Sequence, residues 1–315
     1  MATMPSNMAR ERRRERRQRV LRALREHAQR GGEAPFQPDP EHHAADIADV
    51  LWLDFAPEEA LLTFWQLPPE VAAEVLAESE DPQREKLLGQ ASPEKLGELV
   101  RNMSADDAAD VLEILPEEVR AAVLQNLQPD QARNLRHLGE YGTDTAGGMM
   151  TTEFIAVPPE ERVGDVLKRI KRDEGGAETI HNVYTVEGDG ILKGVVSTRE
   201  LIEAGIHQPL SEILNPDVIK ARVDEDQEEV AQRILHYNLS AIPVTDLRGV
   251  LVGIITVDDA LEVLEEEATE DALLLGGASP ESYTSEPLLW KVRHRAPVLL
   301  VTVLGGTVIS QVMSV

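Results

Sequence analysis

At the usual size of about 100 to 200 residues per domain, a length of 315 residues predicts two or three domains. Hydrophobic residues make up 42% of the chain, which is enough for folded cores, whereas aromatic residues make up only 3%. The chain contains no cysteine, so disulfides, thiolate metal sites and thiol catalysis are excluded. The folded part is therefore expected to face a reducing compartment or to be indifferent to redox.

The net charge of -26 is unevenly distributed along the chain. Residues 1–32 contain ten arginines against three glutamates, which leaves 21 basic and 54 acidic residues for the rest. A body this acidic argues against nucleic-acid binding, and it favours cations or basic surfaces as partners.

The first predicted element is a basic helix over residues 10–30, whose few apolar positions are Val20, Leu21 and Leu24. Its arginines could contact anionic lipid headgroups or RNA, but the preferred interpretation is a mobile, solvated tail. Residues 33–43 contain three prolines and are predicted to be a linker. The two adjacent histidines in this linker are interpreted as part of it rather than as metal ligands.

Between residues 46 and 141 a short unit recurs in steps of 11 to 14 residues. Each unit begins with a proline or a capping residue, such as Ser92 or Ser104, followed by acids and then by apolar residues at helical spacing. These features start helices, so the segment is predicted to be an all-α superhelix whose short helices stack on their neighbours. The predicted starts lie near Pro57, Pro68, Pro82, Pro93, Ala105, Pro116 and Pro129.

From residue 149 the pattern changes to alternating strands and helices, and it occurs twice. A glycine, a hydroxyl residue and an acid at positions 194, 197 and 200 return 59 residues later. Ahead of the two copies lie predicted helices at 162–172 and 226–236, and ahead of those lie short predicted strands around 155–157 and 218–220. Two copies of a strand, helix, strand, turn, strand, helix unit predict one α/β module.

This duplicated pattern resembles the tandem CBS, or Bateman, module. The resemblance implies that strands of the module build a dimer, and that a turn hydroxyl and acid hold the ribose of ATP or another adenine nucleotide. The matching residues are Ser197, Arg199 and Glu200. The chemistry is reasonable because a carboxylate at a strand-to-helix turn can accept both ribose hydroxyls while the helix start faces phosphate.

Residues 257–275 contain eight carboxylates and no lysine or arginine. Their apolar residues have helical spacing, so acids stack one turn apart on a predicted helix. Each such pair of like charges costs about 0.2 to 0.5 kcal/mol. The helix is therefore either merely solvated or a place where cations bind.

Residues 296–315 contain no charged side chain. Twenty helical residues span a hydrocarbon core of about 30 Å, so a transmembrane helix is predicted, with a buried core helix as the alternative. Trp290 and a basic cluster at 291–295 precede this segment, which places residues 1 to about 295 in the cytoplasm. No signal peptide is predicted near Met1, and the chain is expected to be a piece of a larger, multi-pass membrane protein.

The order of these parts resembles the MgtE-type magnesium transporters. The resemblance covers residues 46–315 and rests on four blocks, at 104–110, 146–151, 226–231 and 256–271. It implies a multidomain chain in the cell (inner) membrane that forms a homodimer through the CBS module and the membrane domain. The implied parts are a basic tail and Pro-rich linker at 1–45, an all-α superhelical N-terminal domain at 46–141, an α/β tandem CBS (Bateman) module at 142–271 in halves of about 142–208 and 209–271, a connecting "plug" helix at 272–293 and the start of the transmembrane domain, with the first transmembrane helix, at 294–315.

The resemblance also implies carboxylate sites for Mg²⁺. The matching residues are Glu74, Asp106 and Asp110 in the superhelix, Asp226 and Glu228 in the second CBS unit, and Asp259, Glu262, Glu267, Glu270 and Asp271 in the acidic helix. Asn238 stands where the family pattern is acidic, which would weaken or remove a site there, and Glu262 replaces a shorter aspartate. Mg²⁺ keeps several waters and takes only one or two carboxylates directly, so it can bridge acidic faces through its hydration shell.

The leading interpretation is the cytosolic Mg²⁺-sensing and gating portion of a Mg²⁺ channel or transporter. Mg²⁺ held between the N-terminal domain, the CBS module and the plug helix would favour the closed pore. The alternative is a nucleotide-sensing CBS regulatory module tethered to a membrane partner, whose acids only solvate its surface. An enzyme is not expected because no nucleophile and base pair, Gly-Lys phosphate loop or His-rich metal site is recognisable.

Overall fold

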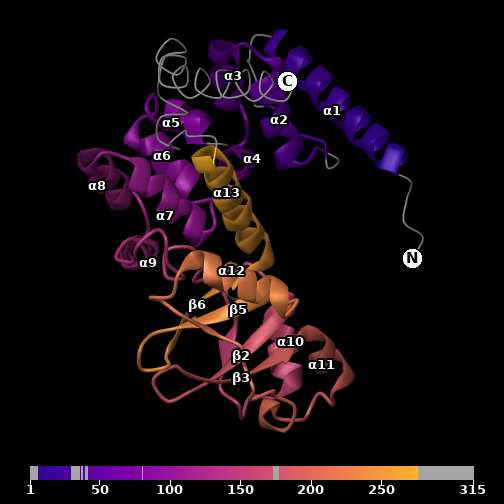
Figure 1. The fold of residues 1–315 in the computed structure, drawn as a ribbon, viewed down its shortest axis with the longest axis vertical. Helices are drawn as coiled ribbons and strands as arrows, with labels where there is room; N and C mark the ends of the chain where they lie inside the picture. The colour runs from indigo at the N-terminus through magenta and orange to yellow at the C-terminus, as the bar shows by residue number, and fades with distance from the viewer. Residues whose placement is uncertain are drawn as a thin grey trace, which may run out of the picture. The chain divides into compact units, whose positions relative to one another are not determined.

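The computed structural model describes residues 6–29, 36, 38–39, 42–79, 81–172 and 177–275. The chain forms two compact units, the first comprising Met1–Glu225 and Ala241–Thr256 and the second Asp226–Ser240 and Val257–Val315. Figure 1 follows the chain from indigo through magenta and orange to yellow. Within the described residues no helix has the length and apolarity needed to cross a membrane. The predicted transmembrane segment at 294–315 and most of the predicted plug helix, residues 276–293, lie outside these residues.

In the part of the first unit that the structure describes, the chain begins with a helical domain of nine helices (Figure 1). Alternate helices pack together, since α2 contacts α4, α4 contacts α6, α6 contacts α8, and α7 contacts α9. The predicted superhelix is thus confirmed, and its predicted helix starts from Pro57 to Pro129 are correct to within one residue, whereas the first helix begins at Ser6 rather than at residue 10. The helices are α1 Ser6–Gln29, α2 Ala44–Asp54, α3 Pro57–Phe64, α4 Pro69–Ala77, α5 Asp81–Leu88, α6 Pro93–Val100, α7 Ala105–Ile114, α8 Glu117–Gln125 and α9 Pro129–Leu138.

The helix starts have the local chemistry that the repeat predicted, with one exception. Proline occupies the first turn of α3, α4, α6 and α9, where its missing N–H has no helical partner to lose. Ser92 caps α6 by accepting a hydrogen bond from the backbone N–H of Lys95 at 3.5 Å. Ser104 does not cap α7. Its hydroxyl donates instead to the Asp107 carboxylate at 2.7 Å, so the prediction of a cap there was wrong.

Helix α1 is helical as predicted, but it is not a solvated tail. Val20 and Leu24, which are one turn apart, are fully buried, and α1 packs against α2. Phe36, in the predicted linker, is also buried, and its ring lies edge-on to His27 at 5.5 Å between centroids. Apolar residues on one face of a helix otherwise rich in arginine give this segment a place in the core.

Two ion pairs explain why a basic helix packs on α2. The Arg17 guanidinium lies 2.9 Å from the Asp54 carboxylate, and the Arg16 guanidinium lies 3.6 Å from that of Asp46. Asp46 is itself buried, so a nearby cation compensates part of its lost hydration. The charge of residues 1–32 is therefore used in part to neutralise acids of the helical domain.

The α/β module contains two three-stranded sheets of the same topology. In each sheet the first strand pairs parallel with the second, and the second pairs antiparallel with the third, so the predicted duplication is confirmed. The strands are β1 Ala156–Val157, β2 Asn182–Glu187 and β3 Ile191–Ser197 in one sheet, and β4 Ala221–Arg222, β5 Ala241–Thr245 and β6 Leu251–Thr256 in the other. The strand predicted at 218–220 was misplaced, because it is Ala221 that is buried and pairs with Val244.

Helices complete the two copies of the repeat. They are α10 Val163–Arg172 and α11 Thr198–Glu203, with a 3₁₀ turn at Leu210–Glu212, in the first unit, and α12 Gln227–His236 and α13 Val257–Leu275 in the second. The helices predicted at 162–172 and 226–236 are confirmed to within one residue at their starts. The acidic helix predicted over 257–275 is confirmed in full.

The repeated glycine of the motif is required by close packing. A Cβ atom on Gly194 would lie 2.6 Å from a methyl carbon of Leu214, and one on Gly253 would lie 2.5 Å from the sulfur of Met150. The two sheets are joined by a β-bridge between Ile191 and Val250. The duplication therefore repeats a packing constraint as well as a sequence.

Replacement of Leu24 by Ala tests whether α1 is part of the folded domain. The variant is expected to lose about 2 to 3 kcal/mol of unfolding free energy, because it removes a fully buried side chain and leaves a cavity. Urea denaturation would measure the loss. Replacement of the neighbouring, exposed Arg25 by Ala should change stability by less than about 0.5 kcal/mol. Equal, small effects of both substitutions would show that α1 is a solvated tail after all.

Candidate functional site

Helix α13 carries the acidic residues that the sequence singled out. Its apolar residues Ala260 and Val263 are buried, and the helix packs against α12. Most of its carboxylates are exposed, whereas Asp259 and Glu267 are partly buried. The helix offers no lysine or arginine of its own to compensate eight negative charges. Such a surface favours cations in its surroundings.

The start of α12 brings three predicted ligands to one end of this helix pair. Asp226 caps α12 by accepting hydrogen bonds from the backbone N–H groups of Glu228 at 2.9 Å and Glu229 at 3.3 Å. Gln227, which lies between two of the predicted ligands in sequence, donates to the Glu267 carboxylate at 3.4 Å. Asp226, Glu228 and Glu267 therefore share one region of the second unit, and Asp226 also has a structural role there.

Asn238, the residue expected to stand where the family pattern is acidic, follows Tyr237, the C-cap residue of α12. Its φ angle is 53°, in the left-handed region, where asparagine is among the few non-glycine residues tolerated without large strain. Its N–H bonds to the carbonyl of Leu235, and the N–H of Leu239 bonds to that of Ile234, as in a Schellman helix ending. The backbone therefore gives a reason for asparagine at this position that is independent of any metal.

A group of acids in the helical domain was only partly predicted. Partial desolvation raises the pKa of the Glu78 carboxyl above its ordinary value, and the nearby charges of Asp107, Asp49 and Glu74 raise it further. Glu74 was a predicted ligand, but the other three acids were not. The sequence signal that could have found Glu78 is its position four residues after Glu74 on α4. We call these four residues the α2–α4–α7 acidic group.

The remaining predicted ligands of the helical domain lie on α7. Asp106 is partly buried and follows the helix start directly, and Asp110 is exposed one turn further on. Asp106 precedes Asp107, a member of the acidic group, so the predicted ligands Glu74 and Asp106 belong to neighbouring parts of one domain.

Among the described residues, no three His, Asp or Glu side chains form a group that could hold a metal ion by themselves. Mg²⁺ does not require such a group, because it keeps several waters and takes one or two carboxylates directly. Three of the ten predicted ligands, Glu74, Asp106 and Asp110, belong to the first unit and seven to the second. The metal sites therefore stay predictions.

The predicted nucleotide residues form a complete helix start. Ser197 accepts from the backbone N–H of Glu200 at 3.2 Å, and the Glu200 carboxylate accepts from the backbone N–H of Ser197 at 2.7 Å and from its hydroxyl at 2.8 Å. This reciprocal capping box stabilises α11 without any ligand. Arg199 is exposed on the same turn. The nucleotide role of these residues stays a prediction.

Two family models match this chain in the order of its parts. Residues 42–144 match the MgtE intracellular N domain, and residues 146–207 and 210–266 match the CBS domain. One solved structure, described as the cytosolic domain of the Mg²⁺ channel MgtE in complex with ATP, is 34% identical with a TM-score of 0.69, covering 77% of this chain and 99% of that one. Another, described as the soluble part of a magnesium transporter, is 29% identical with a TM-score of 0.69, covering 81% and 99%.

The chain is also similar to full-length relatives named magnesium transporter MgtE. The protein of Thermus thermophilus is 37% identical over 280 residues, which are 87% of this chain and 62% of that protein. The protein of Bacillus subtilis is 30% identical over 215 residues, 68% of this chain and 48% of that protein. This chain thus spans about half to two thirds of the length of these relatives, which are transporters rather than enzymes.

The fold is that of a helical N-terminal domain joined to a CBS pair. The chain belongs to the MgtE family of magnesium transporters.

Replacement of Glu78 by Gln tests the α2–α4–α7 acidic group. The pKa of Glu78 is raised in the folded state, so its negative charge lowers the stability of the fold. This loss of stability is fully present above the raised pKa and absent below the ordinary value of 4.5. The variant should therefore be more stable than the parent at pH 7, by up to about 0.5 kcal/mol, and equally stable below pH 4.5. Urea denaturation across this pH range would measure the difference.

The matched control is Glu98→Gln, which removes an exposed glutamate on α6. It should give a smaller change that does not follow the same pH dependence. If Glu78→Gln destabilises the domain at pH 7, the four acids do not repel one another as described.

Proposed function

We propose that this chain is the Mg²⁺-sensing, cytosolic part of a membrane-embedded magnesium transporter or channel. The observation that carries the proposal is α13, which has eight carboxylates and no basic residue and continues from within the second CBS match, at residues 210–266, to Leu275. Membership of the MgtE family indicates Mg²⁺ as the ion. Helix α13 provides a surface on which bound cations would reduce the repulsion between carboxylates. The proposed location is the cell membrane, with residues 1 to about 295 on the cytosolic side.

The proposed mechanism is a population shift. Acidic faces on the N-terminal domain, the CBS module and the plug helix repel one another and favour an open arrangement of these domains. Mg²⁺ ions bind better to the compact arrangement, and that arrangement favours the closed pore. The proposed ligands are those of the family pattern, with Asp259, Glu262, Glu267, Glu270 and Asp271 on α13. Asp259 also stands at the acid position of the second CBS motif, and we assign it to metal. A homodimer through the CBS module and the membrane domain belongs to the same proposal.

Mg²⁺ titration of the 315-residue chain tests the proposal. Millimolar Mg²⁺ should protect the chain from protease and reduce its hydrodynamic radius. Asp259→Asn should raise the Mg²⁺ midpoint about fivefold, since one carboxylate contact to a partly hydrated ion contributes about 1 kcal/mol.

Glu265→Gln provides the control, because it removes one charge from an exposed position of the same helix that is outside the proposed ligand set. A midpoint that moves equally in both variants would indicate only general screening of charge. Compaction that follows ATP and ignores Mg²⁺ would refute the proposal in favour of a nucleotide sensor.

A second function, adenine nucleotide binding by the CBS pair, is supported by one specific observation. The structure that is 34% identical to this chain is a complex with ATP. In our proposal Arg199 contacts phosphate, whereas Ser197 and Glu200 hold the ribose. Glu200 would have to exchange its bonds to Ser197 for bonds to ribose hydroxyls, which is a substitution of similar hydrogen bonds.

Arg199→Ala separates this nucleotide site from general electrostatics. Loss of one arginine contact to phosphate should lower ATP affinity about tenfold, measured by calorimetry on the full chain. Lys171→Ala, which removes an exposed cation from α10, should leave ATP affinity unchanged. Equal losses in the two variants, or no ATP binding by the parent, would contradict the assignment.

A further inference from the structure

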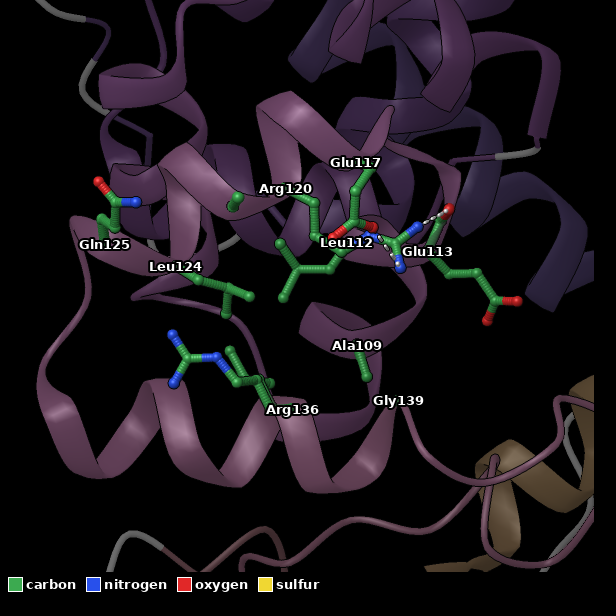
Figure 2. A pocket seen from close by; sticks show the side chains of 11 residues that line it. Ala109, Leu112, Glu113, Glu117, Arg120, Leu124, Gln125, Arg136 and Gly139 are labelled. Carbon is green, nitrogen blue, oxygen red and sulfur yellow. Dashed lines mark hydrogen bonds and ion pairs between the residues drawn. The ribbon is translucent and has the colours of Figure 1, made fainter.

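A cavity of about 510 Å³ lies between α7, α8 and α9 of the helical domain (Figure 2). Its apolar lining comes from Ala109, Leu112, Leu124 and Leu135. Cavities of roughly 300 to 1,000 Å³ that combine apolar wall with placed polar groups are typical of small-molecule sites, and in this cavity polar and apolar groups contribute about equally to the wall. None of the proposed Mg²⁺ or nucleotide residues lines this cavity.

Arg120, at the rim, is already engaged by the protein. Its guanidinium donates to the backbone carbonyls of Glu113 at 3.1 Å and Leu115 at 3.3 Å, at the end of α7. It also lies 3.7 Å from the Glu117 carboxylate. Arg120 and Glu117 therefore neutralise each other, and they form a fixed part of the wall.

Arg136, on α9, has no such partner in the part of the chain that the structure describes. Its exposed side chain lines the cavity together with Leu124, and in Figure 2 its guanidinium points to the side of the cavity on which Leu124 is drawn. The Glu113 carboxylate points away from Leu112 and Leu124 in the same view. The charge of Arg136 thus stands at the edge of a cavity whose wall is part apolar and part polar, with the charges of Arg120 and Glu117 balanced.

Arg136 also lies in the last turn of α9, where a cation interacts favourably with the helix dipole. That role accounts for a basic residue at this position. It does not account for a cavity with an apolar wall beside the guanidinium, so the two explanations predict different effects of substitution on ligand binding.

We propose that this cavity binds a small amphiphilic anion. Its apolar body would pack on Ala109, Leu112, Leu124 and Leu135, and its carboxylate would pair with Arg136. The overall charge of -26 repels anions at long range, but at about 0.15 M salt charges more than about 8 Å apart are largely screened. The affinity for the anion then depends mainly on the short-range contact with Arg136. The proposal does not depend on the Mg²⁺ function.

Octanoate is a suitable probe for the full chain in 0.15 M salt, with binding measured by calorimetry. Octanoate should bind. Octanol should bind at least about fivefold more weakly because it lacks the negative charge, and acetate should not bind because it lacks the long apolar chain. Arg136→Gln should weaken octanoate binding about tenfold, and Arg136→Lys should restore part of it.

Arg133→Gln is the matched control, because Arg133 is an exposed arginine on α9 that pairs with Asp130 and does not line the cavity. It should leave octanoate affinity unchanged. Ala109→Leu should weaken octanoate binding by occupying part of the cavity while Arg136 stays in place. Circular dichroism would establish that each variant is folded.

Three results would overturn the proposal. They are the absence of octanoate binding to the parent chain, equal affinity for octanol and octanoate, and an unchanged affinity in Arg136→Gln. A variant Arg136→Gln that is less stable but binds octanoate as the parent does would leave only the role with the helix dipole.

Discussion

Repulsion between carboxylates is the interaction that the rest of this structure has to accommodate. Two solutions occur in the described residues, and one group of acids lacks both. Arg16 and Arg17 of α1 supply cations to acids of α2. Asp226 accepts backbone N–H groups at the start of α12, where the helix dipole also favours negative charge. At Glu78 neither solution is complete, and partial desolvation together with repulsion by Asp107, Asp49 and Glu74 raises its pKa.

These solutions differ in what they leave for an added ion. An acid that is held by an arginine or by helix N–H groups already has its compensation, and binding a metal there would exchange one interaction for another. The α2–α4–α7 acidic group and α13 bring many carboxylates together within single elements or neighbouring ones. A hydrated divalent ion relieves their repulsion without demanding a rigid cage, and its affinity is correspondingly modest. Modest affinity suits the sensing of an abundant ion.

The sequence predicted features that depend on near neighbours. Proline at the start of helices such as α6 and the 59-residue duplication are local signals, and both were correct. Docking of Arg17 on Asp54 and the grouping of Glu78 with acids of α2 and α7 depend on contacts between distant residues, which periodicity does not contain. The side-chain cap predicted at Ser104 was wrong because its hydroxyl can bond either to a backbone N–H or to the Asp107 carboxylate, and it bonds to the carboxylate. The candidate site was predicted mainly through resemblance, since spacing alone identifies an acidic surface but no ligand set.

The division of the chain into two units has a consequence for how the second unit is connected. The chain passes between the units three times, near residues 225, 240 and 256, with the β5–β6 hairpin between the last two crossings. A single cut at any one crossing cannot release the helix pair α12 and α13. Any rearrangement of that pair must also be accommodated by three backbone connections at once, two of which adjoin the ends of one hairpin.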